Sequence, residues 1–270
     1  MQPSSWNAIH ATEERSPGYA DAVDEVDLHI VCDGNRLTGG AAIPDHPKGV
    51  LMLLHGIPSV NPPEPGDTGY PGLARGFAER GYAAAWVNMR AAHGSRGYFS
   101  IAGWVRDARA ALDATRALPG LSNLKVVMVG SSAGGCVAAE VVRRGAPCHG
   151  LALLAAPAAW VSFAGAPQEA IRRITEEAGM ALAPEVLEDP TGWIDEFQAI
   201  STEAAMPQIK VPVLIVHGTA DDVVDVSHAD RIAERAGNVR VEIIEGAGHR
   251  LRHVPQALDA VERFVKRVAG

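Results

Sequence analysis

The chain has 270 residues, of which 47% are apolar, and its formal charge at pH 7 is −8. This length and apolar content suffice for one sizeable core, and an acidic chain without a stripe of Lys or Arg argues against a nucleic-acid partner. Three cysteines without C-x-x-C spacing indicate neither a disulfide framework nor a zinc knuckle, so we expect free thiols in a reducing compartment.

Residues 1–19 are polar and lack the apolar core of a signal peptide, and a flexible leader is expected over residues 1–24. No run approaches the length of a membrane span. We therefore expect one domain over residues 25–270, located in the cytoplasm and without membrane association, metal or cofactor.

A hairpin is expected first. Residues 26–31 alternate apolar and polar side chains, Asp33-Gly34 is typical of a hairpin turn, and a second strand is expected over residues 36–43.

Strands and helices then alternate to the end of the chain. Apolar runs predict strands at residues 50–54, 82–89, 126–129, 150–156, 211–216 and 239–244. Helices are expected at residues 70–80, 103–118, 133–144, 227–236 and 254–268. This alternation predicts an α/β fold, with a mostly parallel central sheet and helices on both of its faces.

The alternation lapses for about fifty residues after Pro157, which indicates an insertion over residues 158–205. Amphipathic segments at residues 166–178 and 184–197 predict short helices there. The insertion is expected to form a small helical lid.

A sharp turn is expected between the strand at 126–129 and the helix at 133–144. Gly130 to Gly134 spell G-x-S-x-G, a pattern that places Ser132, and not its neighbour Ser131, on a strained turn above the strand ends. Glycine suits both flanks because a side chain there would crowd the turn or the adjoining helix. Ser132 is the predicted nucleophile.

Two further groups follow strands whose carboxyl ends meet the same edge of the sheet. Asp221 ends the run His217-Gly218-Thr219-Ala220-Asp221, and His249 ends Gly246-Ala247-Gly248-His249. Open α/β sheets place their ligands at this edge. A serine hydroxyl needs an imidazole to take its proton, and the imidazole needs an acid that fixes its tautomer. His249 is therefore the predicted base and Asp221 the predicted acid.

Neighbouring residues leave alternatives open. Asp222 is the rival acid, and His253 lies four residues beyond His249, a spacing that metal ligands can have. A Gly-rich loop and the lack of a carboxylate cluster favour the base over the metal. His55 and His217, at strand ends, are expected to be hydrogen-bonded supports.

Together these motifs resemble the α/β-hydrolase family of serine hydrolases, in the family's order from His55-Gly56 to His249. The chain is most similar to small esterases such as feruloyl and cinnamoyl esterases, and to the catalytic domains of prolyl-oligopeptidase-type enzymes. The resemblance implies an oxyanion hole formed by the backbone N–H groups of Ile57 and Ala133. Two departures bear on substrate choice: Asp225 replaces a common proline, and Ala91-Ala92-His93 replaces a tighter Gly-rich run.

The predicted activity is hydrolysis of a small-molecule carboxylic ester through an acyl-enzyme on Ser132. A thioesterase, a small peptidase and a non-catalytic ligand-binding protein of the same fold are the alternatives, and a homodimer is left open.

Several side chains are candidates for substrate binding. Trp160, Trp193 and Phe163 would line an acyl or alcohol pocket, unless they form the lid's own core. Arg96 and Arg90 would hold an acidic group, unless they are ion-paired or solvated.

Overall fold

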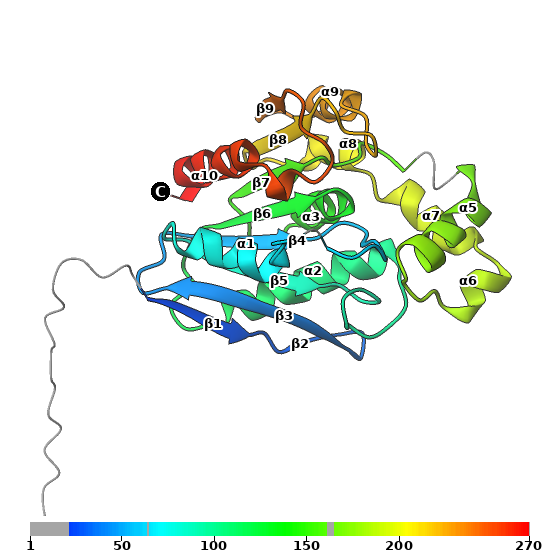
Figure 1. Cartoon of the computed structure of the whole chain (residues 1–270), viewed down its shortest axis with the longest axis horizontal. Helices are drawn as coiled ribbons and strands as arrows, with labels where there is room; N and C mark the ends of the chain where they lie inside the picture. The colour runs from blue at the N-terminus through cyan, green and yellow to red at the C-terminus, as the bar shows by residue number, and fades with distance from the viewer. Residues whose placement is uncertain (1–21, 64, 161–164, 270) are drawn as a thin grey trace, which may run out of the picture.

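The computed structural model describes residues 22–63, 65–160 and 165–269, and one sheet of nine strands runs through it (Figure 1). The strands are β1 Val23–Asp27, β2 Ile30–Cys32, β3 Asn35–Pro44, β4 Val50–Leu54, β5 Ala83–Asn88, β6 Val126–Ser131, β7 Gly150–Leu154, β8 Val213–Gly218 and β9 Val239–Ile244. The helices outside the lid are α1 Gly69–Ala78, α2 Ile101–Arg116, α3 Ala133–Arg143, α9 Ser227–Ala233 and α10 Pro255–Ala269.

The sheet is mostly parallel. Its order is β1-β3-β5-β4-β6-β7-β8-β9, with β2 also paired to β3. All pairs from β5 to β9 are parallel, whereas β3 is antiparallel to β1, β2 and β5. The single strand expected over residues 26–31 is divided into β1 and β2, and β1 begins within the segment predicted as a leader. Residues 1–21 of that segment lie outside the described residues.

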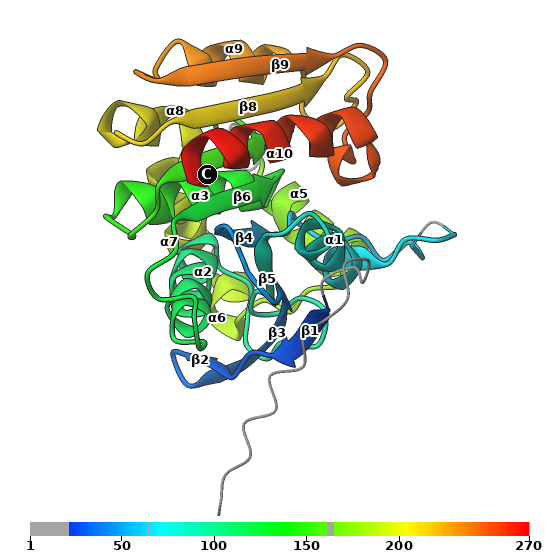
Figure 2. The same cartoon turned by 90° about the vertical axis from the view of Figure 1, so that its left-hand side faces the viewer.

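Helices cover both faces of the sheet, as the sequence predicts (Figure 2). One buried cluster joins α1 and α10 to one face, and a second joins α2, α3 and α9 to the other. Strand β4, buried at every position, lies between them. In the described ranges, no helix combines the length and the apolar character needed to cross a bilayer.

Strand β4 marks the point where the strand order reverses. The chain passes from β4 to β5 on one side and returns to β6 on the other. Open α/β sheets bind ligands beyond the carboxyl ends of the strands at such a point. The segments that leave β4 and β6 are His55-Gly56-Ile57 and the turn at Ser132, so the topology brings two predicted parts of the site together.

The insertion lies beyond these carboxyl ends, where α5, α6 and α7 form a separate group (Figure 1). Its helices are α5 Pro167–Arg172, the π-helical turn Arg173–Glu177, α6 Pro184–Glu188, α7 Thr191–Ala199 and α8 Thr202–Ala205. The helix expected over residues 184–197 is interrupted because Asp189, which precedes Pro190, is extended with φ −141° and ψ 102°.

Candidate active site

Ser132 occupies the turn between β6 and α3 in a strained backbone conformation. Its φ is 52° and its ψ is −125°. Its N–H donates to the carbonyl of Leu154 at 2.8 Å, and its own carbonyl accepts from Gly135 at 2.8 Å. A non-glycine residue keeps such a conformation only where its surroundings impose it, which is common at functional sites.

The flanking glycines allow the backbone of α3 to reach that of β4. A Cβ atom on Gly134 would lie 2.5 Å from the carbonyl oxygen of Leu54, and one on Gly130 would overlap Gly134. A Cβ on Gly56 would lie 2.8 Å from the Cβ of Ser132. The close backbone approach at these three positions explains why each is a glycine, and it places the segment after β4 against Ser132.

This packing supports the oxyanion hole expected at Ile57 and Ala133. Ala133 is the first residue of α3, so its N–H is among the donors that a helix leaves without an intrahelical partner. Ile57 directly follows Gly56, whose backbone touches Ser132. The positive end of the α3 dipole adds to the attraction for an oxyanion here.

Asp221 and His249 have the geometry of an ion pair between a buried carboxylate and a partly buried imidazole. His249 Nδ1 lies 2.8 Å from Oδ2 and 3.0 Å from Oδ1 of Asp221. The Asp221 side chain is 0% exposed and that of His249 is 18% exposed. The N–H groups of Val223 and Val224 donate to Asp221 Oδ1 at 2.9 and 2.8 Å, which fixes the carboxylate. The rival acid, Asp222, is exposed.

The buried side chain of His217 also faces this carboxylate. Its Nε2 lies 2.8 Å from the carbonyl oxygen of Val224 and 3.3 Å from Asp221 Oδ2. Because the carbonyl can only accept, Nε2 carries the proton. His217 Nδ1 has no hydrogen-bond partner among the described residues. His217 therefore acts as a hydrogen-bonded support for the loop that carries Asp221.

His249 and His253 do not converge on a common point. His249 faces Asp221, whereas His253 Nε2 lies 3.5 Å from Asp67. Within the described ranges, no three His, Cys, Asp or Glu side chains are grouped to hold a metal ion.

A salt bridge between Asp67 and Arg252 connects the His249 loop to the start of α1. Both guanidinium Nη atoms donate to the carboxylate at 2.6 Å, and Asp67 Oδ1 accepts from Gly69 N–H at 2.8 Å. The guanidinium carbon lies 5.9 Å from the Tyr70 ring centre. Asp67 stands just before a helix, but nothing in the sequence marks its partner 185 residues later.

Replacing Asp67 by Asn should lower the free energy of unfolding by about 1.5–3 kcal/mol at pH 7, because charge-assisted bonds between largely buried groups are lost. Arg252 holds the pKa of Asp67 far below its usual range. The stabilisation is therefore complete above the unfolded-state pKa of about 3.9 and is lost as the pH falls below that value. Urea unfolding at pH 7, 5 and 3 measures this, with Asp222→Asn as the control. A difference that stays undiminished at pH 3 would contradict the pairing.

Burial keeps His55 uncharged at the end of β4. Its Nε2 accepts the Met89 N–H at 3.0 Å, and its Nδ1 donates to the Gly56 carbonyl at 2.7 Å. Desolvation lowers the pKa of His55 to about 4. A neutral imidazole with one donor and one acceptor fits these partners. His55 therefore connects the loops that begin at Gly56 and Met89 through its two hydrogen bonds.

The arginines of the loop after β5 lie in different settings. Arg90 is buried, and its guanidinium binds Asp107, whose side chain is 0% exposed, at 2.7 Å. Arg90 is thus ion-paired within the protein, which is the alternative that the sequence left open to its binding an acidic group of the substrate. Arg96 is exposed, and its contact with substrate stays a prediction.

The two tryptophans proposed to bind substrate pack in an aromatic cluster within the lid. Trp160 and Trp193 are 7% and 4% exposed, and their rings lie 5.3 and 4.9 Å from Phe197. The Trp160 Nε1 also donates to Cys136 Sγ at 3.2 Å. This packing favours the lid's own core, and a role in substrate binding stays a prediction. Phe163 lies outside the described residues.

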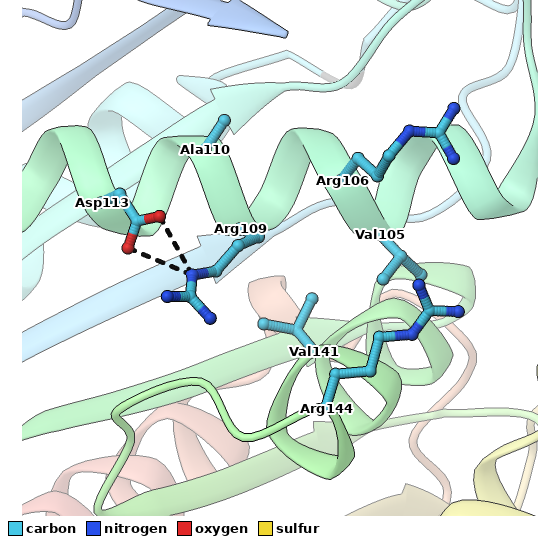
Figure 3. A pocket seen from close by; sticks show the side chains of 7 residues that line it. All are labelled: Val105, Arg106, Arg109, Ala110, Asp113, Val141 and Arg144. Atoms are coloured by element: carbon cyan, nitrogen blue, oxygen red, sulfur yellow. Dashed lines mark hydrogen bonds and ion pairs between the residues drawn. The ribbon is translucent and has the colours of Figure 1, made fainter. Parts of the chain in front are cut away.

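A hollow of about 410 Å³ opens beside the base. Its lining residues are Asp222, Val223, Gly248, His249, Arg250 and Val254. A second hollow, of about 340 Å³, lies between α2 and α3 (Figure 3). It reaches Val141 near the far end of α3 from Ser132, and its arginines are ion-paired, as Arg109 is to Asp113 at 3.0 Å. The first hollow, bordered by His249, is therefore the one that adjoins the site.

Comparisons with known proteins agree with this architecture. Human monoacylglycerol lipase ABHD6 is 41% identical over 56 residues, which are 21% of this chain and 17% of the lipase. The match thus spans less than a fifth of that relative's length.

Two solved structures are similar over almost the whole chain. Esterase Pf2001 of Pyrococcus furiosus has a TM-score of 0.67 and 18% identity, with 93% of this chain and 92% of that one covered. Est1E of Butyrivibrio proteoclasticus, solved with ferulic acid, has a TM-score of 0.68 and 20% identity, with 90% and 100% covered. The predicted α/β-hydrolase fold is confirmed.

The family itself follows from a longer match. The sequence model of the prolyl oligopeptidase family aligns with residues 74–270, which include β5 to β9, the turn at Ser132, and both Asp221 and His249. Because this match covers well over half of the sequence, the chain belongs to the prolyl oligopeptidase family.

Proposed function

We propose that the protein is a serine hydrolase that cleaves carboxylic esters of small molecules through an acyl-enzyme on Ser132. The observation that carries this proposal is the pairing of His249 with the buried carboxylate of Asp221, at the sheet edge where the strained turn presents Ser132. Membership of a family of serine hydrolases and the likeness in fold to two esterases support it.

In the first half of the reaction, Ser132 Oγ attacks the ester carbonyl while His249 takes its proton. Asp221 holds His249 through Nδ1, which directs Nε2 toward the serine and stabilises the imidazolium. The N–H groups of Ile57 and Ala133 bind the oxyanion, and each such donor contributes about 10²–10³ in rate. His249 then protonates the departing alcohol.

In the second half, His249 activates a water molecule that attacks the acyl-enzyme. The acid is released and Ser132 regains its proton. Thioester and amide cleavage would use the same groups, and the family assignment makes a small peptidase the second candidate.

A fluorophosphonate probe tests the nucleophile and an ester panel tests the substrate class. Intact mass should show one adduct on the wild type and none on Ser132→Ala. Turnover of p-nitrophenyl esters of rising acyl length should exceed that of the thioester analogue and of proline p-nitroanilide. Labelling with turnover of the anilide alone would favour the peptidase. Neither labelling nor turnover would favour a ligand-binding protein.

The setting of the cysteines bears on location. Cys32, Cys136 and Cys148 are free thiols in the structure. Burial raises the pKa of their thiols to about 11, 11 and 12. Free thiols are typical of reducing compartments, which supports the proposal of a cytoplasmic protein.

A further inference from the structure

Backbone strain gathers at the carboxyl edge of the sheet. Among the described residues, the non-glycine residues with positive φ are Asp33, Ala91, His93, Ser132 and Ala155, and all except Asp33 follow a parallel strand. Two of them, Ala91 at 63° and His93 at 47°, share the loop after β5. Glycine adopts this conformation at no steric cost, whereas other residues do so at a cost. The presence of two non-glycine residues in this conformation in one loop therefore needs an explanation.

Surrounding hydrogen bonds impose the strained conformation on this loop. Ser95 Oγ donates to the Asn88 carbonyl at 2.5 Å and accepts the Thr38 N–H at 2.9 Å. Asn88 Nδ2 donates to the carbonyl of His93 at 3.2 Å, and the buried guanidinium of Arg90 anchors the start of the loop on Asp107. The loop therefore presents the side chain of His93 from a rigid base.

The His93 ring lies beside the start of the segment that follows β4. Its ring centre is 5.3 Å from that of His55, in an edge-to-face arrangement. The residue after His55 is Gly56, which packs closely against Ser132. Arg252, three residues after His249, lies near enough for its charge to act on the His93 imidazole. Partial desolvation of the ring first, and then the charge of Arg252, lower the pKa of His93. At neutral pH the imidazole is uncharged and can both donate and accept a hydrogen bond.

His93 is nevertheless exposed, although His55 beside it is buried. A side chain whose role was to pack in the core would be buried. A strained backbone that instead holds a side chain at the surface is not explained by packing. Strain held in place by its surroundings is typical of residues that a binding site requires in one position.

We propose that His93 is a substrate-contacting residue that forms a hydrogen bond with an oxygen-bearing substituent of the ester. This inference rests on the proposed function and adds a substrate class to it: esters with a hydroxyl group near the scissile bond. The hydroxyl belongs either to the acyl part or to the alcohol part, and paired substrates distinguish the two.

Ala91→Gly and His93→Gly form a matched pair for the test. Both variants relieve a left-handed non-glycine residue in the same loop, so both should raise the midpoint of thermal unfolding by about 1–3 °C. Only His93→Gly removes the imidazole. The substrates are two pairs of esters: methyl lactate beside methyl propionate, and 2-hydroxyethyl acetate beside propyl acetate. Hydrolysis is measured as the release of acid.

The wild type and Ala91→Gly should prefer the hydroxylated member of one pair. His93→Gly should lose about tenfold in kcat/KM on that member and stay within about twofold on the plain ester, because one hydrogen bond is lost. His93→Asn, which tolerates the left-handed conformation and keeps a donor and an acceptor, should recover part of the preference.

Two results would overturn the inference while leaving the proposed function intact. One is equal kcat/KM of the wild type on both members of both pairs. The other is a preference that His93→Gly retains as fully as Ala91→Gly does. A wild type that neither reacts with the fluorophosphonate nor turns over any ester would instead reject the proposed function, and the inference with it.

Discussion

Replacing Asp221 by Asn is expected to lower kcat/KM for ester hydrolysis by about 10⁴, with the fold intact. Asp221 accepts from His249 Nδ1 at 2.8 Å, which leaves Nε2 free to accept the serine proton. An amide has no charge to stabilise the imidazolium, and its NH₂ group favours the wrong tautomer. Because the Asn carbonyl can still accept from Val223 and Val224, the loop should keep its shape.

Asp222→Asn is the matched control for this prediction. Asp222 is the next residue and has the same charge, but its side chain is exposed while that of Asp221 is 0% exposed. We expect its kcat/KM to stay within about twofold of the wild type, since surface substitutions have small effects. Steady-state kinetics, beside thermal unfolding of both variants, provide the measurement. Loss of activity in Asp222→Asn with Asp221→Asn active would reverse the assignment of the acid.

The central sheet could be predicted from the sequence because its signals are local. Strands β4 and β9 begin and end at the predicted residues, and α3 ends one residue early. Apolar runs and the G-x-S-x-G turn fix these elements without reference to distant residues. The order of strands along the chain then places Ser132, Asp221 and His249 at one edge, since parallel strands end on the same side.

Other features depend on tertiary contacts that no local pattern marks. Asp67 and Arg252 are 185 residues apart in the sequence, so no local pattern pairs them. No glycine marks the left-handed conformation of His93 in the sequence, and its loop is held by hydrogen bonds from Thr38, 55 residues before His93. Trp160 has the same apolar character whether it lines a pocket or a core, and its packing against Phe197, which favours the core, is visible only in the folded chain.

Gly134→Ala is expected to destabilise the protein by about 3 kcal/mol or more. The added methyl group would lie 2.5 Å from the carbonyl oxygen of Leu54, a backbone atom that no rotamer change can move. Relief requires α3 to shift away from β4. Such a shift would also move Ala133 away from Ile57, so the oxyanion donors would separate and activity would fall with stability.

Gly76→Ala in α1 is the control, because a Cβ there meets nothing within 4 Å. Alanine favours the helix by about 0.5–1 kcal/mol over glycine, so this variant should be slightly more stable than the wild type. Urea unfolding of both variants measures the difference. If Gly134→Ala unfolds at the midpoint of the wild type, then the close approach of α3 to β4 is not what holds the turn. The strain at Ser132 would then need another source, such as the hydrogen bond from its N–H to Leu154.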